Sequence, residues 1–425
     1  MASLLSRLKA NRHHLTGAVW TGIDQLLSSV SNLVISLATA RAGGAEGLGL
    51  YAVAFAIYLM VFGMQRALVS DPLLTIPVAN RDPSDDRSRL GLGAALTYLI
   101  PVSLIVLVVG IAMGSGPIVV LSAFLPLVCL QDLYRHIFFR QQRPELAAVL
   151  DGIWVVSSLI GWVLIAQSGS PAVAVGVWGT GGALGALAGA MISRSTPAEP
   201  RASVRWWLTE ARTLGGFLGV DQALFAIFIQ LVTLGLAAIL GAADVGRLRG
   251  AQVVLGPVGL ILTAFQVFIL PRLAGARHML TTRTAVVTSA AAGTLTLFGA
   301  VLLWVMSPWL LPLLYGDSLE LPPVLLLAVG VTMTIRALSI GPILQLKARQ
   351  RGVPIASARL VTGLLGLPVV LGTASILGLV PAVWAQSVPA LAFVGLLYVA
   401  LFRSSHAGES VGLEKSRRRS RRADS

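Results

Sequence analysis

The sequence predicts an all-α polytopic membrane protein with about twelve transmembrane helices in two six-helix lobes. Composition is the first reason: of 425 residues, 56% are hydrophobic and 12% charged, and the mean hydropathy is +0.82. One soluble core could not bury so many apolar side chains. The second reason is that apolar runs of about 20 residues recur along the chain. The third is that basic residues gather between alternate runs.

Each apolar run is long enough to cross a hydrocarbon layer about 30 Å thick. We expect the helices at 15–40, 48–70, 90–112, 117–139, 145–167, 171–193, 213–238, 250–271, 284–306, 321–346, 355–377 and 379–402. The first run is too long for a signal-peptide core, and Asp24 and Gln25 interrupt it. The loops predicted to lie outside are short, so no external catalytic domain fits there.

Basic residues predict the side of the membrane on which each loop lies. With a cytoplasmic N-terminus, only Arg41, Arg247 and Arg249 fall in outer loops, while the inner loops carry most of the charge. This bias predicts a multi-pass protein of the cell (cytoplasmic) membrane with both termini in the cytoplasm. The net charge of +14 then needs no nucleic-acid partner, and none is expected.

The predicted inner loops also divide the chain into domains. Residues 1–193 form an N-terminal lobe and residues 213–403 a C-terminal lobe of six helices each. Between them, 194–212 is a cytoplasmic linker that ends in a short interfacial helix, anchored by Trp206 and Trp207. The basic tail 404–425 is polar and is expected to be disordered; it holds the C-terminus inside or recognises anionic lipid.

The two lobes resemble each other in their first helices. Gly22, Asp24 and Gln25 of the first helix match Gly219, Asp221 and Gln222 of the seventh, and an acid-bearing loop follows each. Because each half has an even number of helices, both copies enter the membrane in the same direction. The match therefore predicts a parallel pseudo-repeat about an axis along the membrane normal.

Motifs for catalysis are missing from the chain. It has no Walker A loop, no HExxH spacing and no histidine cluster, so we expect neither an enzyme nor a metal or cofactor site. What remains is a set of ionisable residues inside apolar runs, where charge is costly and commonly functional.

Arg66 and Arg336 are the deepest cationic candidates. Apolar sequence continues well beyond each of them, so neither simply marks a helix end. Asp71-Pro72 should break the helix just after Arg66, and an arginine beside a break usually faces a cavity. The competing interpretation of both arginines is a buried ion pair with no substrate contact.

The stretch CLQDLYRHIFFRQQRPE places polar residues at the end of the fourth run. Gln131, Asp132, Arg135 and His136 are spaced three or four apart and so share a helix face, which must look into a cavity or a neighbouring helix. Arg135 lies about one turn from Arg140 and could also snorkel to the cytoplasmic surface. A local ion pair and a substrate contact both remain open for it.

Asp24 and Asp221 lie roughly 10 to 13 Å inside the membrane by helix rise. A carboxyl group at that depth could bind a proton or a sodium ion, or could serve as a polar contact between helices.

Two stretches, GLGLYAVAFAIYLMVFGMQRALVSDPL (47–73) and LQDLYRHIFFRQQRPELAAVLDGIW (130–154), resemble the polysaccharide flippase branch of the multidrug/oligosaccharidyl-lipid/polysaccharide exporter superfamily. The resemblance implies alternating access that moves a polyprenyl-diphosphate-linked glycan from the inner to the outer leaflet. It also implies polysaccharide polymerase or glycosyltransferase partners. The second half has no counterpart of Arg66 near Gln266, so a symmetric cationic site is not expected.

In this interpretation the polar residues have distinct roles. Arg66, Arg336, Arg135 and Gln131 bind the diphosphate, because arginine pairs with phosphate through two parallel hydrogen bonds. Asp24 and Asp221 couple transport to H⁺ or Na⁺, whereas Asp71 and Asp132 gate or form ion pairs.

Two other functions remain as alternatives. A cation-coupled multidrug exporter should show more cavity carboxylates and fewer arginines. A membrane subunit or scaffold of a cell-surface polysaccharide assembly complex would need neither Arg66 nor Arg336.

Overall fold

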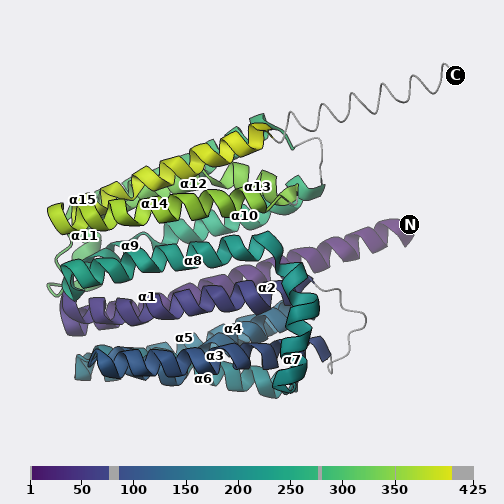
Figure 1. The fold of residues 1–425 in the computed structure, drawn as a ribbon, viewed down its shortest axis with the longest axis horizontal. Helices are drawn as coiled ribbons and strands as arrows, with labels where there is room; N and C mark the ends of the chain where they lie inside the picture. The colour runs from purple at the N-terminus through teal and green to yellow at the C-terminus, as the bar shows by residue number, and fades with distance from the viewer. Residues whose placement is uncertain (1, 76–85, 276–279, 350, 404–425) are drawn as a thin grey trace.

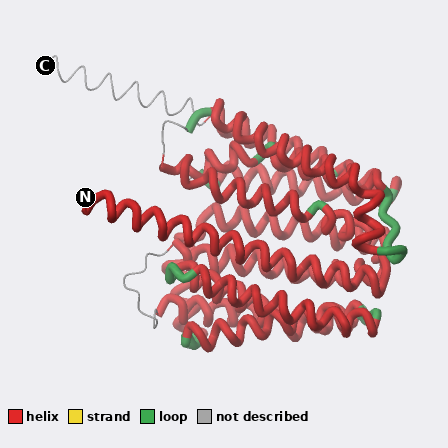
Figure 2. Tube along the Cα trace, turned by 180° about the vertical axis from the view of Figure 1, so that it is seen from behind, coloured by secondary structure: helices red, strands yellow, loops and turns green. Residues whose placement is uncertain are grey.

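The computed structural model describes residues 2–75, 86–275, 280–349 and 351–403. It describes the side chains of 19–74, 86–211, 219–266, 269, 280–349 and 351–403. Long helices run side by side, and the chain enters and leaves the bundle at the same end (Figure 1). Short loops join the helices, and the described residues contain no strand (Figure 2). The tail 404–425, predicted to be disordered, lies outside the described residues.

The N-terminal half contains α1, the π-helix η1, and α2 to α6. Their bounds are α1 Ala2–Gln65, η1 Arg66–Ser70, α2 Asp71–Thr75, α3 Asp86–Ala112, α4 Gly116–Arg140, α5 Pro144–Ser168 and α6 Pro171–Ser193. The C-terminal half follows a short linker helix. The linker contains α7 Pro200–Trp206 and the π-helix η2 Trp207–Ala211. The elements of the C-terminal half are α8 Arg212–Leu240, α9 Ala242–Val254, α10 Gly256–Gly275, α11 Thr282–Tyr315, α12 Pro323–Ala337, α13 Ile340–Ala348, α14 Val353–Leu377 and α15 Leu379–Ala385. The last helix resumes after Gln386 and ends at Arg403.

Helix length and hydropathy confirm the twelve-helix prediction. Among the described residues, ten helices are long and apolar enough to span a membrane, and the pair α9 and α10, bent by 52°, makes eleven. One of these, Val19–Leu74, has 56 residues, or about 80 Å at 1.5 Å per residue, far more than one crossing needs. It reverses at Gly44, whose φ of 61° suits glycine. That stretch therefore supplies two spans, and the total is twelve.

The structure extends several predicted spans. The eighth begins at Ala242 and not at 250, because α9 precedes the bend at Leu255. Arg247 and Arg249, predicted in an outer loop, therefore lie within a helix. The ninth continues through Pro308 and Pro312 to Tyr315, past the predicted end at 306.

The predicted helix break at Asp71-Pro72 is wrong. The helix widens into η1 and continues as α2, and the Asp71 amide donates to the Arg66 carbonyl, one residue farther back than in an α-helix. Pro72 has no N–H for the carbonyl four residues earlier, that of Leu68. The Trp207 indole N–H donates to this carbonyl at 2.9 Å instead. A side chain from the linker thus replaces the missing backbone donor.

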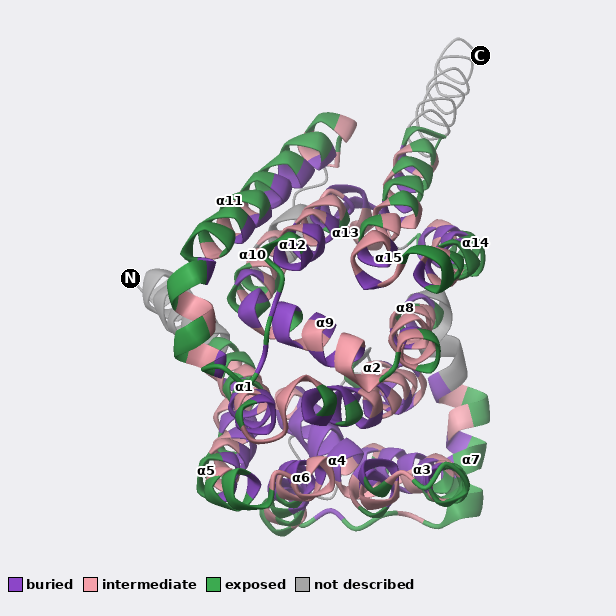
Figure 3. Ribbon diagram, turned by 90° about the vertical axis from the view of Figure 1, so that its left-hand side faces the viewer, coloured by how far each residue is buried: buried purple, intermediate pink, exposed green. Residues whose placement is uncertain are grey.

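The helices form two lobes with a close contact between them. In Figure 3, which looks along the bundle, α1 and α3–α6 lie below and α8–α15 above. Ala45 and Gly49 of α1 pack directly on Ala242 and Gly246 of α9, and a Cβ atom at Gly49 would overlap the Ala242 carbonyl. Both α1 and α8 start from the end where the chain enters and leaves, as a parallel repeat requires (Figure 1).

Candidate functional site

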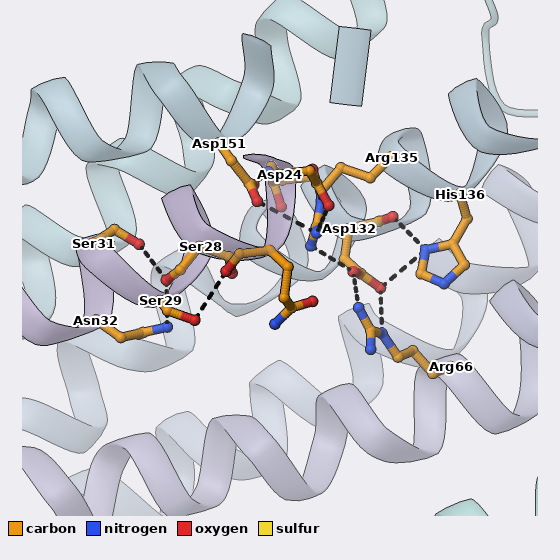
Figure 4. Close-up of polar contacts among 12 residues, drawn as sticks. Asp24, Ser28, Ser29, Ser31, Asn32, Arg66, Asp132, Arg135, His136 and Asp151 are labelled. Atoms are coloured by element: carbon orange, nitrogen blue, oxygen red, sulfur yellow. Dashed lines mark hydrogen bonds and ion pairs between the residues drawn. The ribbon is translucent and has the colours of Figure 1, made fainter. Parts of the chain in front are cut away.

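Five charged side chains meet inside the N-terminal lobe (Figure 4). Asp24 comes from α1, Arg66 begins η1, Asp132 and Arg135 come from α4, and Asp151 comes from α5. We call these five residues the N-lobe charge cluster. Four elements converge here, so the cluster joins segments of sequence up to 127 residues apart, as the separation of Asp24 and Asp151 shows.

Asp132 bridges the two arginines of the cluster. Arg66 donates to both carboxylate oxygens of Asp132, at 3.0 Å from Nε and 2.6 Å from Nη2. Arg135 Nη1 donates to the same carboxylate at 3.2 Å. The Asp132 side chain is only 1% exposed, whereas that of Arg66 is 36% exposed. Arg66 is thus the member of the cluster that solvent or a ligand can reach.

Arg135 joins Asp132 to the two remaining carboxylates. Its Nε and Nη2 donate to Asp24 at 3.0 and 2.5 Å, and Nη2 lies 3.3 Å from Asp151. The Arg135 side chain is 8% exposed and therefore does not snorkel to the surface. Of the two roles left open for Arg135, the structure shows the ion pair, and the contact with substrate stays a prediction.

Gln131 and His136 complete the polar environment. Gln131 donates to Asp151 at 2.7 Å, and His136 Nδ1 lies 2.8 Å from the Asp132 carbonyl oxygen and 3.4 Å from its carboxylate. Gln131 faces away from solvent, with 1% exposure. Two guanidinium groups therefore face three carboxyl groups, so the cluster carries a formal charge of −1 if all three are ionised. One bound proton or monovalent cation would neutralise it.

The C-terminal lobe contains a smaller charged group. Asp221 of α8 is buried and forms an ion pair with Arg359 of α14. The Arg359 guanidinium also lies over two aromatic rings, 4.7 Å from the centroid of Phe225 and 4.5 Å from that of Phe393. Arg359, which falls within the predicted span 355–377, is thus held inside the lobe.

A cavity of about 310 Å³ lies between the lobes. Helices α1, α8, α9, α12 and α15, with Gln386 beyond α15, contribute to its wall. Its polar lining consists of Gln230, Thr233, Arg249, Gln252, Thr332, Arg336 and Gln386, and none of the described residues that line it is acidic. The cavity is therefore electropositive and rich in hydrogen-bond donors.

Both arginines of the cavity lack a carboxylate partner among the described residues. Arg336 donates to Gln386 at 3.1 Å. Arg249 stacks over the Phe55 ring at 4.5 Å, and its buried Nε has no hydrogen-bond partner within the described part of the chain. A side chain of this kind is poised to donate to an anion.

The structure separates the predicted site residues into groups. Arg66, Arg135, Asp132 and Asp24 share the N-lobe charge cluster, and Asp221 lies in the other lobe. Asp71 is half-buried next to η1, with no ion pair to a described residue. Among the predicted site residues, Arg336 alone lines the cavity.

Three candidates for the site were not predicted from the sequence: Asp151, Arg249 and Arg359. Asp151 and Arg359 interrupt predicted spans near their cytoplasmic ends, a signal that was present in the sequence.

The fold is similar to that of solved transporters of the multidrug/oligosaccharidyl-lipid/polysaccharide exporter (MOP) superfamily. Solved structures of that superfamily match almost the whole chain. They include an inward-facing multidrug resistance MATE transporter, with a TM-score of 0.66, 14% identity and coverage of 92% of this chain and 99% of that chain. The lipid II flippase MurJ in an inward closed conformation gives a TM-score of 0.67 and 15% identity over 91% of this chain and 87% of that chain.

A third match is a MOP superfamily transporter from Pyrococcus furiosus, whose binding pocket has reversed polarity according to its description. It gives a TM-score of 0.59 and 14% identity over 92% of this chain and 94% of that chain. The sequence matches no protein-family profile and no curated protein. At these identities the structural matches establish the fold.

Proposed function

We propose that this protein is an alternating-access transporter that flips a polyprenyl-diphosphate-linked glycan across the cytoplasmic membrane. The observation that carries the proposal is the cavity between the lobes, where Arg249 and Arg336 belong to a lining whose described residues include no acid. A cation inside a membrane protein that has no carboxylate partner is costly there, so an anionic substrate group is its natural partner.

A diphosphate suits the chemistry of this cavity. Arginine keeps its charge at any physiological pH and presents two parallel N–H donors to phosphate oxygens. The side chains of Gln230, Gln252 and Gln386 can donate to sugar hydroxyls or to further phosphate oxygens. A volume of about 310 Å³ fits a head group of a diphosphate and a sugar, while the polyprenyl tail stays in the lipid.

Arg66 has a separate role in the proposal. Its side chain is 36% exposed, and it lies two residues before Leu68, whose carbonyl contacts the linker that we place in the cytoplasm. We infer that it receives the diphosphate as the lipid enters. Phosphate would then replace Asp132 as the partner of Arg66. The N-lobe charge cluster, now with a free carboxylate, would bind a proton or sodium ion at Asp24 or its neighbours. Loading of the substrate and of the ion are thereby linked.

A cation-coupled multidrug exporter is the second candidate, because the N-lobe charge cluster contains three carboxyl groups. Those carboxyl groups are buried against arginines and do not line the cavity. The flippase agrees better with the cavity itself. A scaffold function within a polysaccharide assembly complex would require no transport by the purified chain, so the same experiment separates it.

The experiment is a flipping assay with purified protein in liposomes that carry a short-chain polyprenyl-diphosphate glycan. Arg249→Gln with Arg336→Gln should remove most of the flipping, and the corresponding lysine variant should retain part, because lysine keeps the charge but loses the forked geometry. Arg283→Gln, which removes an exposed arginine at the start of α11, is the matched control. Full flipping by the double glutamine variant, or efflux of a cationic dye that depends on the cluster, would contradict the proposal.

A further inference from the structure

The linker between the lobes presents a basic and apolar face that the transport cycle does not use. Helix α7 and η2 run across the bundle and not along it, at the end where the chain enters and leaves (Figures 1 and 3). If the long helices cross the membrane, a helix in this orientation lies parallel to the membrane surface. The basic loops place that surface on the cytoplasmic side.

One side of the linker is fixed to the N-terminal lobe. Ser203 and Trp206 are buried, and the Ala198 amide donates to the Arg89 carbonyl at 2.9 Å. Glu210 of η2 forms an ion pair with Arg87 of α3 at 3.3 Å. Trp206 was predicted to anchor the linker at the membrane interface, but in the structure its ring packs inside the protein. The linker is therefore held in a defined orientation, and its other face has a fixed composition.

The outward face combines two basic and two apolar residues. Arg201 and Arg205 are exposed and spaced four apart, as are Val204 and Leu208, which are 40% and 46% exposed. The spacing puts the arginines on one ridge of the helix and the apolar pair on the next. No ion pair of either arginine exists within the described residues, in contrast to Arg87.

We propose that this face binds the phosphate groups of anionic phospholipids in the inner leaflet. Guanidinium groups at the membrane surface attract anionic head groups, and an adjacent apolar ridge can enter the boundary of the acyl chains. Glu199 is an exposed acid nearby. It occupies the N-cap position of α7 before the turn that carries Arg201 and Arg205, which has a positive net charge. A soluble anion would not need Val204 and Leu208 beside the arginines, whereas the acyl-chain boundary of a lipid does contact apolar side chains.

Bound lipid on this face would act on both lobes. The linker continues through η2 directly into α8, which carries Asp221. On the other side, the Trp207 indole holds the Leu68 carbonyl two residues from Arg66. The face thus connects the lipid surface to the junction about which the lobes must move, and anionic lipid should stabilise that junction.

The test measures thermal stabilisation of the full chain in detergent on titration with phosphatidylglycerol or phosphatidylcholine. For Arg201→Gln with Arg205→Gln, we expect the apparent affinity for phosphatidylglycerol to fall about 30-fold, from about 1 kcal/mol per surface arginine. Arg283→Gln should leave it unchanged. The melting temperature without added lipid shows whether the variant is folded, and Arg201→Lys with Arg205→Lys should retain binding.

Three outcomes would overturn the proposal. The first is unchanged phosphatidylglycerol affinity in the double glutamine variant. The second is an equal loss in Arg283→Gln, which would indicate a diffuse effect of cytoplasmic charge. The third is that inorganic pyrophosphate stabilises the wild-type chain as much as phosphatidylglycerol does, and that the double glutamine variant loses this stabilisation. That result would indicate a site for free phosphate. If the glutamine variant unfolds, Val204→Ser with Leu208→Ser takes its place, and unchanged affinity there also contradicts a lipid face.

Discussion

The two lobes start from a matching carboxylate but differ in charge. Asp24 of α1 and Asp221 of α8 occupy equivalent positions, and each pairs with an arginine. In the N-terminal lobe that arginine is Arg135 of α4, which Asp132 and Asp151 share. With Arg66, the N-lobe charge cluster has three carboxyl groups and two guanidinium groups. In the C-terminal lobe, Asp221 pairs with Arg359, while Arg249 and Arg336 line the cavity without a carboxylate partner among the described residues.

Corresponding helices show where the charge changes. Asp151 lies about two turns into α5 and Arg359 about two turns into α14, the fifth helix of each lobe in the parallel repeat. An acid on one side of the molecule is thus replaced by a base on the other. The difference teaches that a repeated fold can gather carboxyl groups in one lobe and unpaired guanidinium groups beside the other, which is the division that the proposed function requires.

Removal of the bridging carboxylate should give the largest effect. Asp132→Asn leaves Arg66 and Arg135 without their shared partner, and breaking a buried ion pair costs about 3–5 kcal/mol. Asp221→Asn should cost less, because Arg359 keeps its contacts with Phe225 and Phe393. Thermal unfolding of the purified chain measures both. Equal destabilisation by the two variants would show that the lobes do not differ in this way.

Ion coupling should divide between the lobes in the same direction. Neutralising Asp24 to asparagine should remove the dependence of transport on a proton or sodium gradient, because the N-lobe charge cluster then balances its two arginines without a bound ion. Asp221→Asn should leave most of that dependence, because the charge of the Asp221 carboxylate is already balanced by its one partner, Arg359. Flipping rates with and without each gradient provide the measurement. Unchanged gradient dependence in the double variant would reduce both residues to packing.

The contact between α1 and α9 gives the smallest predicted effect. Gly49→Leu should separate the lobes there, because a side chain at Gly49 has no room against the Ala242 carbonyl. A cysteine placed at Thr233 in the cavity should then react faster with a membrane-impermeant thiol reagent added on the side of the membrane where α1 contacts α9. The native Cys129 is buried and should not react with the reagent. Gly395→Leu, where a Cβ atom meets nothing within 4 Å, is the control. Equal reactivity in the two variants would show that this contact does not hold the lobes together.

Much of the fold could be predicted, because hydropathy and the positive-inside bias follow from the lipid environment. Arg249 could not, since the segment AADVGRLRG has too few apolar residues to resemble a span. In the structure this segment faces the other lobe and the cavity, where lipid does not select for apolar side chains. Arg66 lies within a helix that is long and apolar enough to cross a membrane, as the sequence predicted. Its partner Asp132 lies 66 residues away, and a single sequence does not contain that contact.

The central claim is that Arg249 and Arg336 bind a diphosphate between the lobes. The most direct measurement is the affinity of the purified chain for a short-chain polyprenyl diphosphate, with the monophosphate of the same lipid for comparison. We expect the wild-type chain to prefer the diphosphate, and Arg249→Gln with Arg336→Gln to weaken its binding about 100-fold or more, from about 1.5–3 kcal/mol for each charged hydrogen bond. Arg283→Gln should bind as the wild type does. Unchanged diphosphate affinity in the folded double variant would contradict the claim.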